Sequence, residues 1–567
     1  MATSDAPLSV PNLTLAVART RSQSPVLNDQ AGYIAFDVPV IRHATTGGTM
    51  PVRLIRRRGS TGSLTVQLSA TDWFRAQGVQ SYAGESVTFA DGEMIKVVNI
   101  PLNSITLDGE AHFILNVTIT NALIPGVRWH ELHTKVIVDD GSIYSSGKVL
   151  DDPTTQIIQD EAVDNSIVYL RAGTWDDYSV PGYVELYGND GQKGTSFRDR
   201  QNIVIRNYPG ENPIITCSAP WGSGLFTRSN KNVCFYGLEI TGTGENSFLP
   251  VYIKQLTANS PDEYVYVFDC HIHHWYGGDN TGGIRNDDGW RCVSFNNKIH
   301  DGYDTRTTPG NPYTASPYGF HAGIHGYGNR EFFVYQNTIY HVKRGLYRKQ
   351  PSELGGMSPL FARNLVYSIE GSAADYEYAG SSDYASYDHA VFENICIGCS
   401  AAGLDFSTSN ISADQITRAL IYNNLVVDDG LFVVRDLTGI EVWNNLVIGG
   451  TAGSTIAMSL DGRSPGELTY CDFNGYEKDY RYLVGRNATL RSYDSFSAWQ
   501  ASDESQAADN QVPANPDANG AKGAPVFVGA GDYHLDPTDT LYRNQGRFAL
   551  ESIGAYRLGH EQIGATI

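Results

Sequence analysis

Positive charge is scarce in this sequence. Its 567 residues include 41 Lys and Arg against 62 Asp and Glu, so the formal net charge is −21, and charged residues make up only 18% of the chain. Nucleic acids and anionic membrane surfaces are held by clusters of Lys and Arg, so this composition argues against both as main partners. The chain also lacks an apolar run of the ~20 residues that a membrane-spanning helix needs, which argues against membrane insertion.

Cysteine is too sparse and too scattered for a disulfide framework. The seven residues are an odd number, and the single Cys-x-x-Cys pair has no second pair to complete a zinc site. Free cysteines behave as small hydrophobic residues, so we expect these thiols to be buried in a core. They are Cys217, Cys234, Cys270, Cys292, Cys396, Cys399 and Cys471.

The N-terminus as given lacks the pattern of a secretory signal. Asp5 stands where basic residues belong, and the apolar stretch of residues 13–17 is too short for the core of such a signal. We therefore expect either a leader that has been removed or release by another route, such as within a phage particle.

Glycine and tyrosine are abundant, with 58 and 34 residues, and this composition suits a turn-rich, all-β protein. Between residues 30 and 141, apolar and polar residues alternate in short runs that are separated by Gly, Asp and Asn turns. Alternation with a period of two predicts an antiparallel β-sandwich. Residues 1–29 precede this domain as an N-terminal arm.

The order of the predicted strands carries a resemblance to a known family. ESVTFADGEMIKVVNIPL, LDGEAHFILNVTITN and KVIVDDG follow one another, and together they resemble the Calx-β family of Greek-key sandwiches. The alternative to a calcium-binding domain is an adhesion or spacer module whose loop carboxylates are only solvated. The resemblance implies calcium ligands among the acidic loop residues Asp108, Glu110, Asp139 and Asp140.

A repeat follows a polar linker and entry cap at residues 142–165. An aromatic or apolar residue, a polar residue, Asn and an apolar residue recur in FNNKI, YQNTI, ARNLV, FENIC, YNNLV and WNNLV. Such short, variable spacings favour a solenoid with insertions over a β-propeller, whose blades need about 40 residues. The repeated Asn predicts a ladder of side-chain amides at turns that tolerate left-handed backbone. With two degenerate copies, the third positions are Gly237, Cys270, Asn297, Asn337, Asn364, Asn394, Asn424 and Asn445.

Both ends of this region resemble a known superfamily. SIVYLRAGTW with NIVIRNYPGENPIITC resembles the opening coils of right-handed parallel β-helices of the pectate-lyase-like superfamily. Within this superfamily, these segments most resemble relatives of alginate lyase and chondroitinase B. Phage tailspikes share the fold. The stretch at 524–556 resembles the closing segment of such proteins. We therefore expect an all-β chain, with a right-handed parallel β-helix at 166–480 and a closing segment at 481–567.

A second repeated segment predicts one stacked sheet with a chemically mixed outer face. Alternation along its strands places Leu225, Val251, Ile284, Ile324, Leu346 and Leu404 inside. Neighbouring coils of such a sheet lie ~4.8 Å apart, so distant residues come together on its outer side. The predicted outer residues, called the mixed face below, are Arg228, Lys254, Arg285, Asp287, His325, Tyr327, Tyr347, Lys349, Glu377, Asp405 and Ser407.

The insertions at 301–320 and 371–388 are rich in Tyr, Gly, Asn and Asp. Aromatic faces and polar forks are the groups that bind sugar rings and hydroxyls, so loops of this kind beside the mixed face suit a polysaccharide groove. Insertions that a solenoid merely tolerates are the alternative. The predicted substrate-binding residues are Arg285, Asp287, Lys254, Tyr347, Tyr318 and Tyr378.

Two chemistries fit the mixed face. β-Elimination on a uronic acid needs a base, a proton donor and a cation for the carboxylate, and Lys349, Arg348, Arg285, His325 and Tyr327 supply these residue types. Glycoside hydrolysis needs two carboxylates, which Glu377 and Asp405 supply, with Asp287 further away. The Asn-Gly-x-Glu and Lys-Ser-Ser motifs of the alginate lyase group are absent, so no catalytic residue is transferred from it.

The segment HIHHW at 271–275 is a candidate metal site. His271 and His273 alternate on one side of a predicted strand with His274 opposite, and His300 and His341 occupy comparable turns in the following coils. Zinc is commonly bound by imidazoles. Stacked or solvated turn histidines are the alternative.

Together these features predict an extracellular or virion-associated β-helix that recognises an acidic or capsular polysaccharide and depolymerises it. Elimination is slightly favoured over hydrolysis, and no cofactor other than calcium is implied. The alternative is a phage tail fibre, spike or adhesin that binds a surface glycan without cleaving it. Virion or oligomer partners would then bind through the N-terminal domain.

Overall fold

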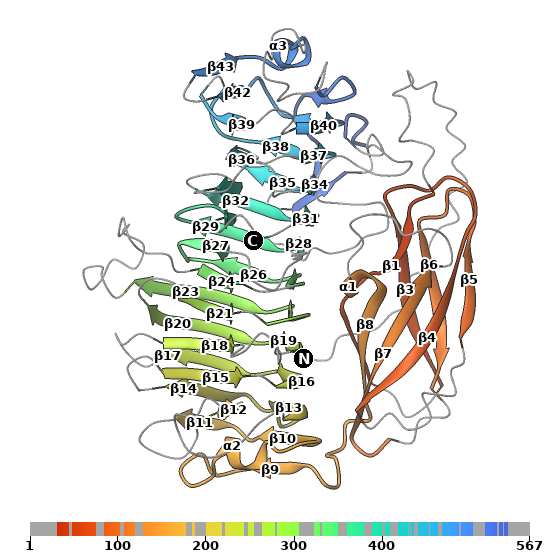
Figure 1. Ribbon diagram of the computed structural model, residues 1–567, viewed down its shortest axis with the longest axis vertical. Coiled ribbons are helices and arrows are strands. Elements are labelled where there is room, and N and C mark those ends of the chain that lie inside the picture. Colours follow the sequence, from red (N-terminus) through yellow and green to blue (C-terminus); the bar gives the residue numbers. More distant parts are fainter. Residues whose placement is uncertain are drawn as a thin grey trace.

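The computed structural model places the elements of an all-β protein, with short helices between some of them (Figure 1). Tyr318 lies outside the described residues, as do the side chains of Lys349, Glu377 and Tyr378. No helix among the described residues is long and apolar enough to cross a bilayer. The structure describes residues 31–44, 48–74, 84–102, 107–119, 129–176, 184–186, 200–217, 222–228, 230–242, 248–254, 263–277, 281–287, 289–304, 322–328, 331–349, 360–378, 388–399, 403–408, 418–428, 430, 432–435, 440–452, 454–462, 468–486, 489–502, 516–529, 532–536 and 538–542.

The N-terminal domain is a sandwich of two sheets, as the alternating pattern predicted. Apolar side chains from both sheets meet in one buried core, which includes Leu54, Val66 and Phe113. The first sheet has the order β1 (Tyr33–Phe36), β3 (Thr49–Arg57), β6 (Ile95–Pro101). The second has the order β2 (Val40–Ala44), β8 (His133–Asp139), β7 (Glu110–Ile119), β4 (Leu64–Phe74), β5 (Glu85–Phe89), with α1 (Trp129–Leu132) before β8.

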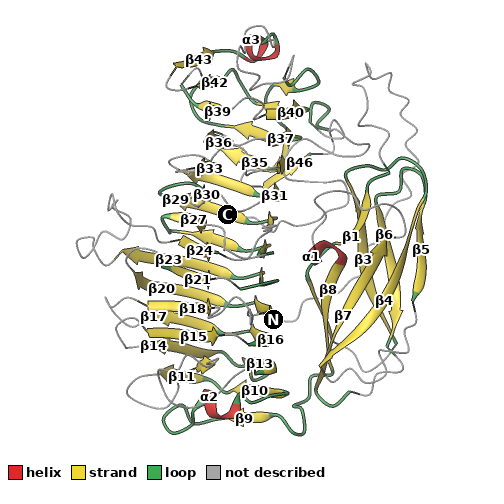
Figure 2. Ribbon diagram, viewed as in Figure 1, coloured by secondary structure: helices red, strands yellow, loops and turns green. Residues whose placement is uncertain are grey.

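The rest of the chain winds into three long sheets whose neighbouring strands are parallel in all but the last pair of sheet 3 (Figure 2). This confirms the predicted sandwich and parallel β-helix. Sheet 1 runs β9 (Lys148–Leu150), β10 (Ser166–Leu170), β13 (Gln201–Asn207), β16 (Lys231–Tyr236), β19 (Glu263–Phe268), β22 (Val293–Phe295), β25 (Phe333–Tyr335), β28 (Leu360–Ala362), β31 (Asp388–Phe392), β34 (Arg418–Tyr422), β37 (Ile440–Trp443), β40 (Leu468–Asp472).

Sheets 2 and 3 complete each coil. Sheet 2 runs β11 (Gly173–Asp176), β14 (Pro213–Cys217), β17 (Glu239–Gly242), β20 (His271–Gly277), β23 (Lys298–Asp304), β26 (Thr338–Tyr340), β29 (Leu365–Ile369), β32 (Ile395–Cys399), β35 (Leu425–Val427), β38 (Leu446–Ile448), β41 (Gly475–Tyr476), β44 (Ala521–Lys522). Sheet 3 runs β12 (Val184–Leu186), β15 (Gly222–Arg228), β18 (Phe248–Lys254), β21 (Gly282–Asp287), β24 (Ala322–Tyr327), β27 (Arg344–Lys349), β30 (Ala374–Tyr378), β33 (Leu404–Thr408), β36 (Phe432–Arg435), β39 (Ile456–Gly462), β42 (Arg481–Arg486), β43 (Thr489–Tyr493).

The solenoid is held by stacked apolar rows inside and by an amide ladder at one turn. Each ladder Asn before the last donates from Nδ2 to Oδ1 of the Asn in the next coil, at 2.9–3.1 Å, which confirms the predicted ladder. The left-handed backbone lies one residue earlier than predicted, as at Arg363 and Glu393 with φ near 55°. The six cysteines whose side chains the structure describes are free and buried, as expected. The ladder consists of Asn297, Asn337, Asn364, Asn394, Asn424, Asn445 and Asn474.

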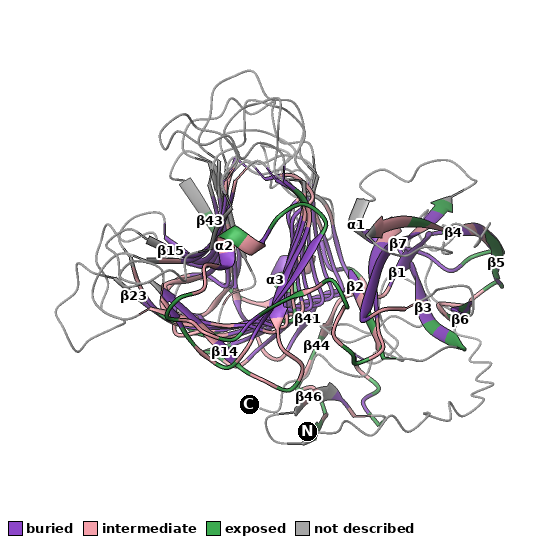
Figure 3. Cartoon of the chain, turned by 90° about the horizontal axis from the view of Figure 1, so that it is seen from below, coloured by how far each residue is buried: buried purple, intermediate pink, exposed green. Residues whose placement is uncertain are grey.

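The sandwich does not stand apart from the solenoid but lies along the outer face of sheet 1 (Figures 1 and 3). Apolar and aromatic side chains of both domains form one buried cluster there, with Val40 and Ile137 from the sandwich and Tyr236 and Phe392 from the solenoid. One face of the β-helix is therefore covered by the sandwich rather than open to a ligand.

Two short helices lie near the ends of the solenoid, and a hairpin packs against its side. Helix α2 (Ile158–Glu161) precedes the first coils, and α3 (Phe496–Gln500) follows β43. The antiparallel hairpin of β45 (Phe527–Gly529) and β46 (Asp532–Leu535) packs on the apolar outer side of sheet 2 near Leu425 and Leu446.

Candidate functional site

The mixed face is the outer side of sheet 3. On the inner side of the same strands lie the residues that the sequence predicted to point inward. The register pairs Val251 with Ile284, Ile284 with Ile324 and Ile324 with Leu346. All six residues predicted to point inward are at most 2% exposed and belong to the main core. The strands are therefore aligned coil by coil as the second repeat indicated.

Two parallel rows of functional residues follow from this register. The first row places Arg285 beside His325, and Tyr347 beside Asp375. The second row places Asp287 beside Tyr327, and Lys349 between Tyr327 and Glu377. The complete rows are Tyr252, Arg285, His325, Tyr347, Asp375 and Asp405, and Lys254, Asp287, Tyr327, Lys349, Glu377 and Ser407.

Arg348 lies on neither outer row. The register places it between Gly326 and Tyr376, in the row that holds the buried Asn286. Its side chain is 3% exposed. Because side chains alternate along a strand, Arg348 is directed away from the mixed face, and the cations of that face come from other positions.

Arg285, Asp287 and Tyr252 form a tight polar cluster on the mixed face. Arg285 donates to Asp287 from Nε and Nη2 at 2.7–3.0 Å, and the Tyr252 hydroxyl donates to Asp287 Oδ2 at 2.8 Å. Burial and the Asp287 charge raise the pKa of Tyr252. Tyr252 was missed in the sequence, although it occupies the position of Arg285 one coil earlier.

His325 and Tyr347 stack in the next two coils, with ring centroids 5.2 Å apart. Both are fully buried, so substrate reaches them only if the groups that cover them move. Arg344 binds Asp375 and lies over the Tyr347 ring with its guanidinium carbon 4.7 Å from the ring centroid. Asp375 was also missed, although the repeat aligns ADYEY with LDFST.

The carboxylate pair differs from the one that was predicted. Glu377 is in register with Ser407, whereas Asp405 is in register with Asp375. The two aspartates thus occupy one row on adjacent strands. The predicted pair of Glu377 and Asp405 is offset by two residues along the sheet.

The acidic residues assigned to calcium have other partners in the structure. Glu110 is 1% exposed and binds the side chains of Arg206, Tyr236 and His112. Asp139 binds Arg206 at 2.9 Å. Asp108 accepts from the amide and hydroxyl of Ser145, and Asp140 accepts from the amide of Ser142. Calcium would have to displace these contacts, and its binding stays a prediction.

The histidines of HIHHW gather on the outer side of sheet 2. His271 Nε2 lies 2.8 Å from His300 Nε2, and His273 Nε2 lies 3.1 Å from Glu239 Oε1. Burial and the neighbouring imidazoles lower the pKa of His271 to about 4, and burial lowers that of His273 and His300. Burial opposes ionisation of Glu239, but hydrogen bonds from Asn212 and His273 keep its pKa below the usual range.

A hollow of about 750 Å³ lies away from the mixed face, where the sandwich meets the turns of the solenoid. Arg42 and Asp139 line it from the sandwich, and Arg206, Asp269 and Lys298 line it from the solenoid. Its position shows that the hollow and the mixed face are separate features of the molecule.

Three solved structures illustrate what the chain is similar to, whereas no family model and no curated protein sequence matches it. The Calx CBD2 domain is 11% identical over 20% of this chain and 88% of its own, with a TM-score of 0.16. PfbA, a surface adhesin of Streptococcus pneumoniae, is 11% identical over 62% and 90%, with a TM-score of 0.32. Pectate lyase C from Erwinia chrysanthemi is 13% identical over 55% and 78%, with a TM-score of 0.27. Such low values carry no activity over to this chain.

Proposed function

We propose that this protein binds an acidic polysaccharide outside the cell along the mixed face of sheet 3 and cleaves it by β-elimination. The observation that carries the proposal is the row in which Tyr327, Lys349 and Glu377 occupy neighbouring strands beside Arg285 and His325. A solvated solenoid face has no need for that mixture of acids, bases and cations, whereas a uronic acid polymer offers a partner for each.

Each role follows from residue type and position. Lys349 is the base that removes the proton from C5 of the uronic acid, and Tyr327 donates a proton to the glycosidic oxygen that leaves. A double bond forms between C4 and C5 as that C–O bond breaks. Arg285, with 20% of its side chain exposed, neutralises the uronate as the proton departs. Lys254 lies at one end of the second row and binds a flanking sugar.

Hydrolysis is the second candidate, because Asp375 and Asp405 lie in register on adjacent strands. Adjacent strands are ~4.8 Å apart, close to the ~5–5.5 Å between the carboxyl groups of a retaining glycosidase. Arg344 already binds Asp375, so Asp375 would be the ionised nucleophile and Asp405 the proton donor.

Purified protein incubated with a panel of uronic acid polysaccharides and bacterial capsules distinguishes these functions. Elimination produces ultraviolet absorbance from the unsaturated product, and hydrolysis produces new reducing ends without it. Retained binding with neither product would support the adhesin or tail-fibre alternative. In the same experiment, the Lys349→Ala variant is expected to eliminate at least ~100-fold more slowly than the wild type. Lys231 is an exposed residue of sheet 1, and Lys231→Ala is expected to leave the rate of elimination unchanged.

A further inference from the structure

Four potential metal ligands meet on the outer side of sheet 2, which is a different face from the mixed face. Glu239 lies on β17, His271 and His273 on β20, and His300 on β23. These are consecutive strands, and the register pairs Glu239 with His271 and His273 with His300. Regular strands, rather than a loop, therefore bring the four side chains together.

Three of the donor atoms are close enough to one another to share one ion. Glu239, His271 and His273 each offer a ligand atom within 4.8 Å of the other two. The fourth residue, His300, has its Nε2 2.8 Å from His271 Nε2. Two imidazole nitrogens at that distance cannot both carry protons, so at least one bare lone pair already points into the cluster.

Neighbouring side chains contact three of these ligands through atoms other than the proposed donor atoms. Asn212 donates to the second oxygen of Glu239 at 2.6 Å, and Thr241 Oγ1 lies 3.3 Å from His273 Nδ1. His300 Nδ1 lies 2.8 Å from Asp301 Oδ2. A carboxylate that accepts from Nδ1 fixes the ring so that Nε2 is free to bind a metal, which is the usual support for a metal-bound histidine.

We propose that Glu239, His271, His273 and His300 bind one divalent transition ion of the zinc class, which cross-links three consecutive coils. Imidazole and carboxylate ligands suit zinc and its neighbours in the first transition row, whereas calcium and magnesium prefer oxygen alone. The site is partly buried, with 13% of the His273 side chain and 9% of the His300 side chain exposed. An ion from solvent can therefore reach it.

Only a small movement is needed for His271 and His300 to bind the same ion. Zn–N distances of ~2.0–2.1 Å in a tetrahedral site separate ligand nitrogens by about 3.3 Å. The His271 and His300 nitrogens are 2.8 Å apart, so their rings must separate by about half an ångström.

The test uses the full-length protein, stripped of metal with a chelator and titrated with Zn²⁺ against a chromogenic competitor. One zinc per chain is expected. X-ray absorption at the zinc edge is expected to show nitrogen and oxygen neighbours at ~2.0–2.1 Å with histidine scattering, and no sulfur at ~2.3 Å. This measurement needs no variant. A sulfur shell, or no zinc retained after gel filtration, would overturn the proposal.

Variants then assign the ligands. Glu239→Gln keeps the shape of the side chain and is expected to weaken zinc binding at least ~10-fold, and His273→Gln is expected to do the same. Asp301→Asn removes the carboxylate that orients His300 and is expected to weaken zinc binding ~10–100-fold. Tyr367→Phe is the control on the same face, because Tyr367 lies two strands beyond His300 and stacks on Tyr340. Circular dichroism without metal shows whether each variant is folded. Equal zinc affinity in the wild type and in a folded Glu239→Gln, His273→Gln double variant would contradict the site.

Discussion

At the scale of single residues, the notable charges lie where the two domains meet rather than on the mixed face. Glu110 of the sandwich binds Arg206 and the Tyr236 hydroxyl of the solenoid, and none of these three side chains is more than 4% exposed. The Arg206 guanidinium and hydrogen bonds from His112 and Tyr236 lower the pKa of Glu110 despite its burial. A residue that the sequence assigned to calcium is thus part of an interdomain ion pair.

Glu110→Gln is expected to lower the free energy of unfolding at neutral pH by about 3 kcal/mol, because breaking a buried pair leaves one charge uncompensated. Chemical denaturation measures the loss. Asp140→Asn, in a nearby turn at the domain surface, serves as control and should cost less than ~1 kcal/mol. The depressed pKa of Glu110 contributes stability above the unfolded value of ~4.3, so the difference between wild type and variant should shrink as the pH falls below that value.

His112 gives the interface a second dependence on pH. It is fully buried against Trp73, with ring centroids 5.5 Å apart, and burial together with the Lys135 charge lowers its pKa to about 4. A lowered pKa means that the unfolded chain binds the proton more tightly. The stability that neutral His112 contributes is therefore complete above the unfolded value of ~6.5 and is lost as the pH falls from there to about 4.

We accordingly expect the free energy of unfolding to fall by on the order of 2 to 3 kcal/mol between pH 6.5 and 4 because of His112. Denaturation curves at half-unit pH steps measure this slope. His112→Gln keeps a donor for Glu110 but cannot take up the proton, so its slope in this range should be smaller. A wild type and a variant with parallel slopes would show that His112 does not cause the dependence.

At the scale of elements, the repeat made the solenoid predictable. The coils with a ladder Asn repeat one turn, and the Asn side chain donates to buried backbone carbonyls. Asn394, for example, donates to the carbonyls of Phe361 and Phe392 and to Asn424, and accepts from Asn364. Because the repeat fixes both period and register, the inner rows and the ladder could be predicted. The exact partner of Asp405 could not, because two candidate carboxylates, Asp375 and Glu377, lie two residues apart on one strand.

Asn394→Ala is expected to lower the free energy of unfolding by ~3 kcal/mol or more, because it leaves several buried polar groups without partners. Asn296→Gly is the control, since Asn296 is exposed at the preceding position of another coil and its φ of 53° suits glycine. Thermal or chemical unfolding followed by circular dichroism compares the two. If Asn394→Ala lowers the free energy of unfolding by less than 1 kcal/mol, the amide ladder contributes little to the stability of the solenoid.

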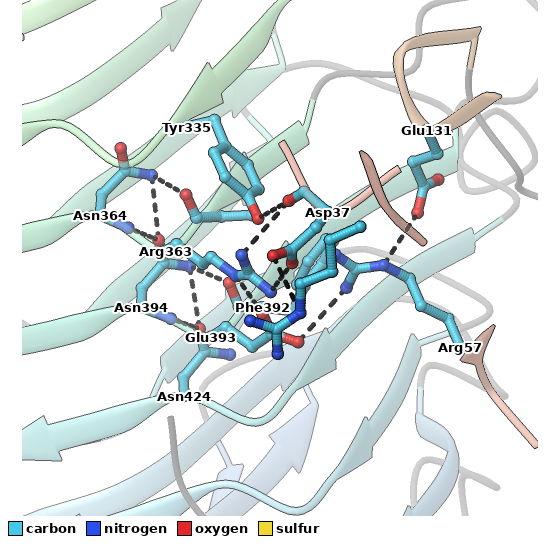
Figure 4. A network of polar contacts seen from close by, with 12 residues as sticks. Asp37, Arg57, Glu131, Tyr335, Arg363, Asn364, Phe392, Glu393, Asn394 and Asn424 are labelled. Carbon is cyan, nitrogen blue, oxygen red and sulfur yellow. Dashed lines mark hydrogen bonds and ion pairs between the residues drawn. The ribbon is translucent and has the colours of Figure 1, made fainter. Parts of the chain in front are cut away.

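At the scale of the whole molecule, the sandwich and solenoid form one assembly, and the sequence did not predict this. Figure 4 shows the polar network that joins them: Glu393 binds Arg57 of the sandwich at 3.3 Å and Arg363 of the preceding coil at 2.6 Å, and Arg363 binds Asp37 of the sandwich at 2.8 Å. Arg363 and Glu393 precede ladder residues in adjacent coils, where the left-handed turn lies. Pairings between residues more than 300 positions apart leave no periodic pattern in a sequence.

Glu393→Gln is therefore expected to loosen the docking of the sandwich, because it leaves Arg57 and Arg363 facing each other without the carboxylate between them. Both arginines are at most 5% exposed, and an uncompensated charge buried in this way costs about 3 to 5 kcal/mol. Calorimetry should show one cooperative transition in the wild type and a separate, earlier transition of the sandwich in the variant. Limited proteolysis in the linker at 142–147 should become faster in parallel.

Arg42→Ala is the matched control, since Arg42 also bridges the domains, to Asp269 at 2.8 Å, but is 42% exposed and should contribute at most ~1 kcal/mol. Equal effects of the two substitutions would mean that the apolar cluster around Tyr236 and Phe392, rather than the buried ion network, holds the domains together.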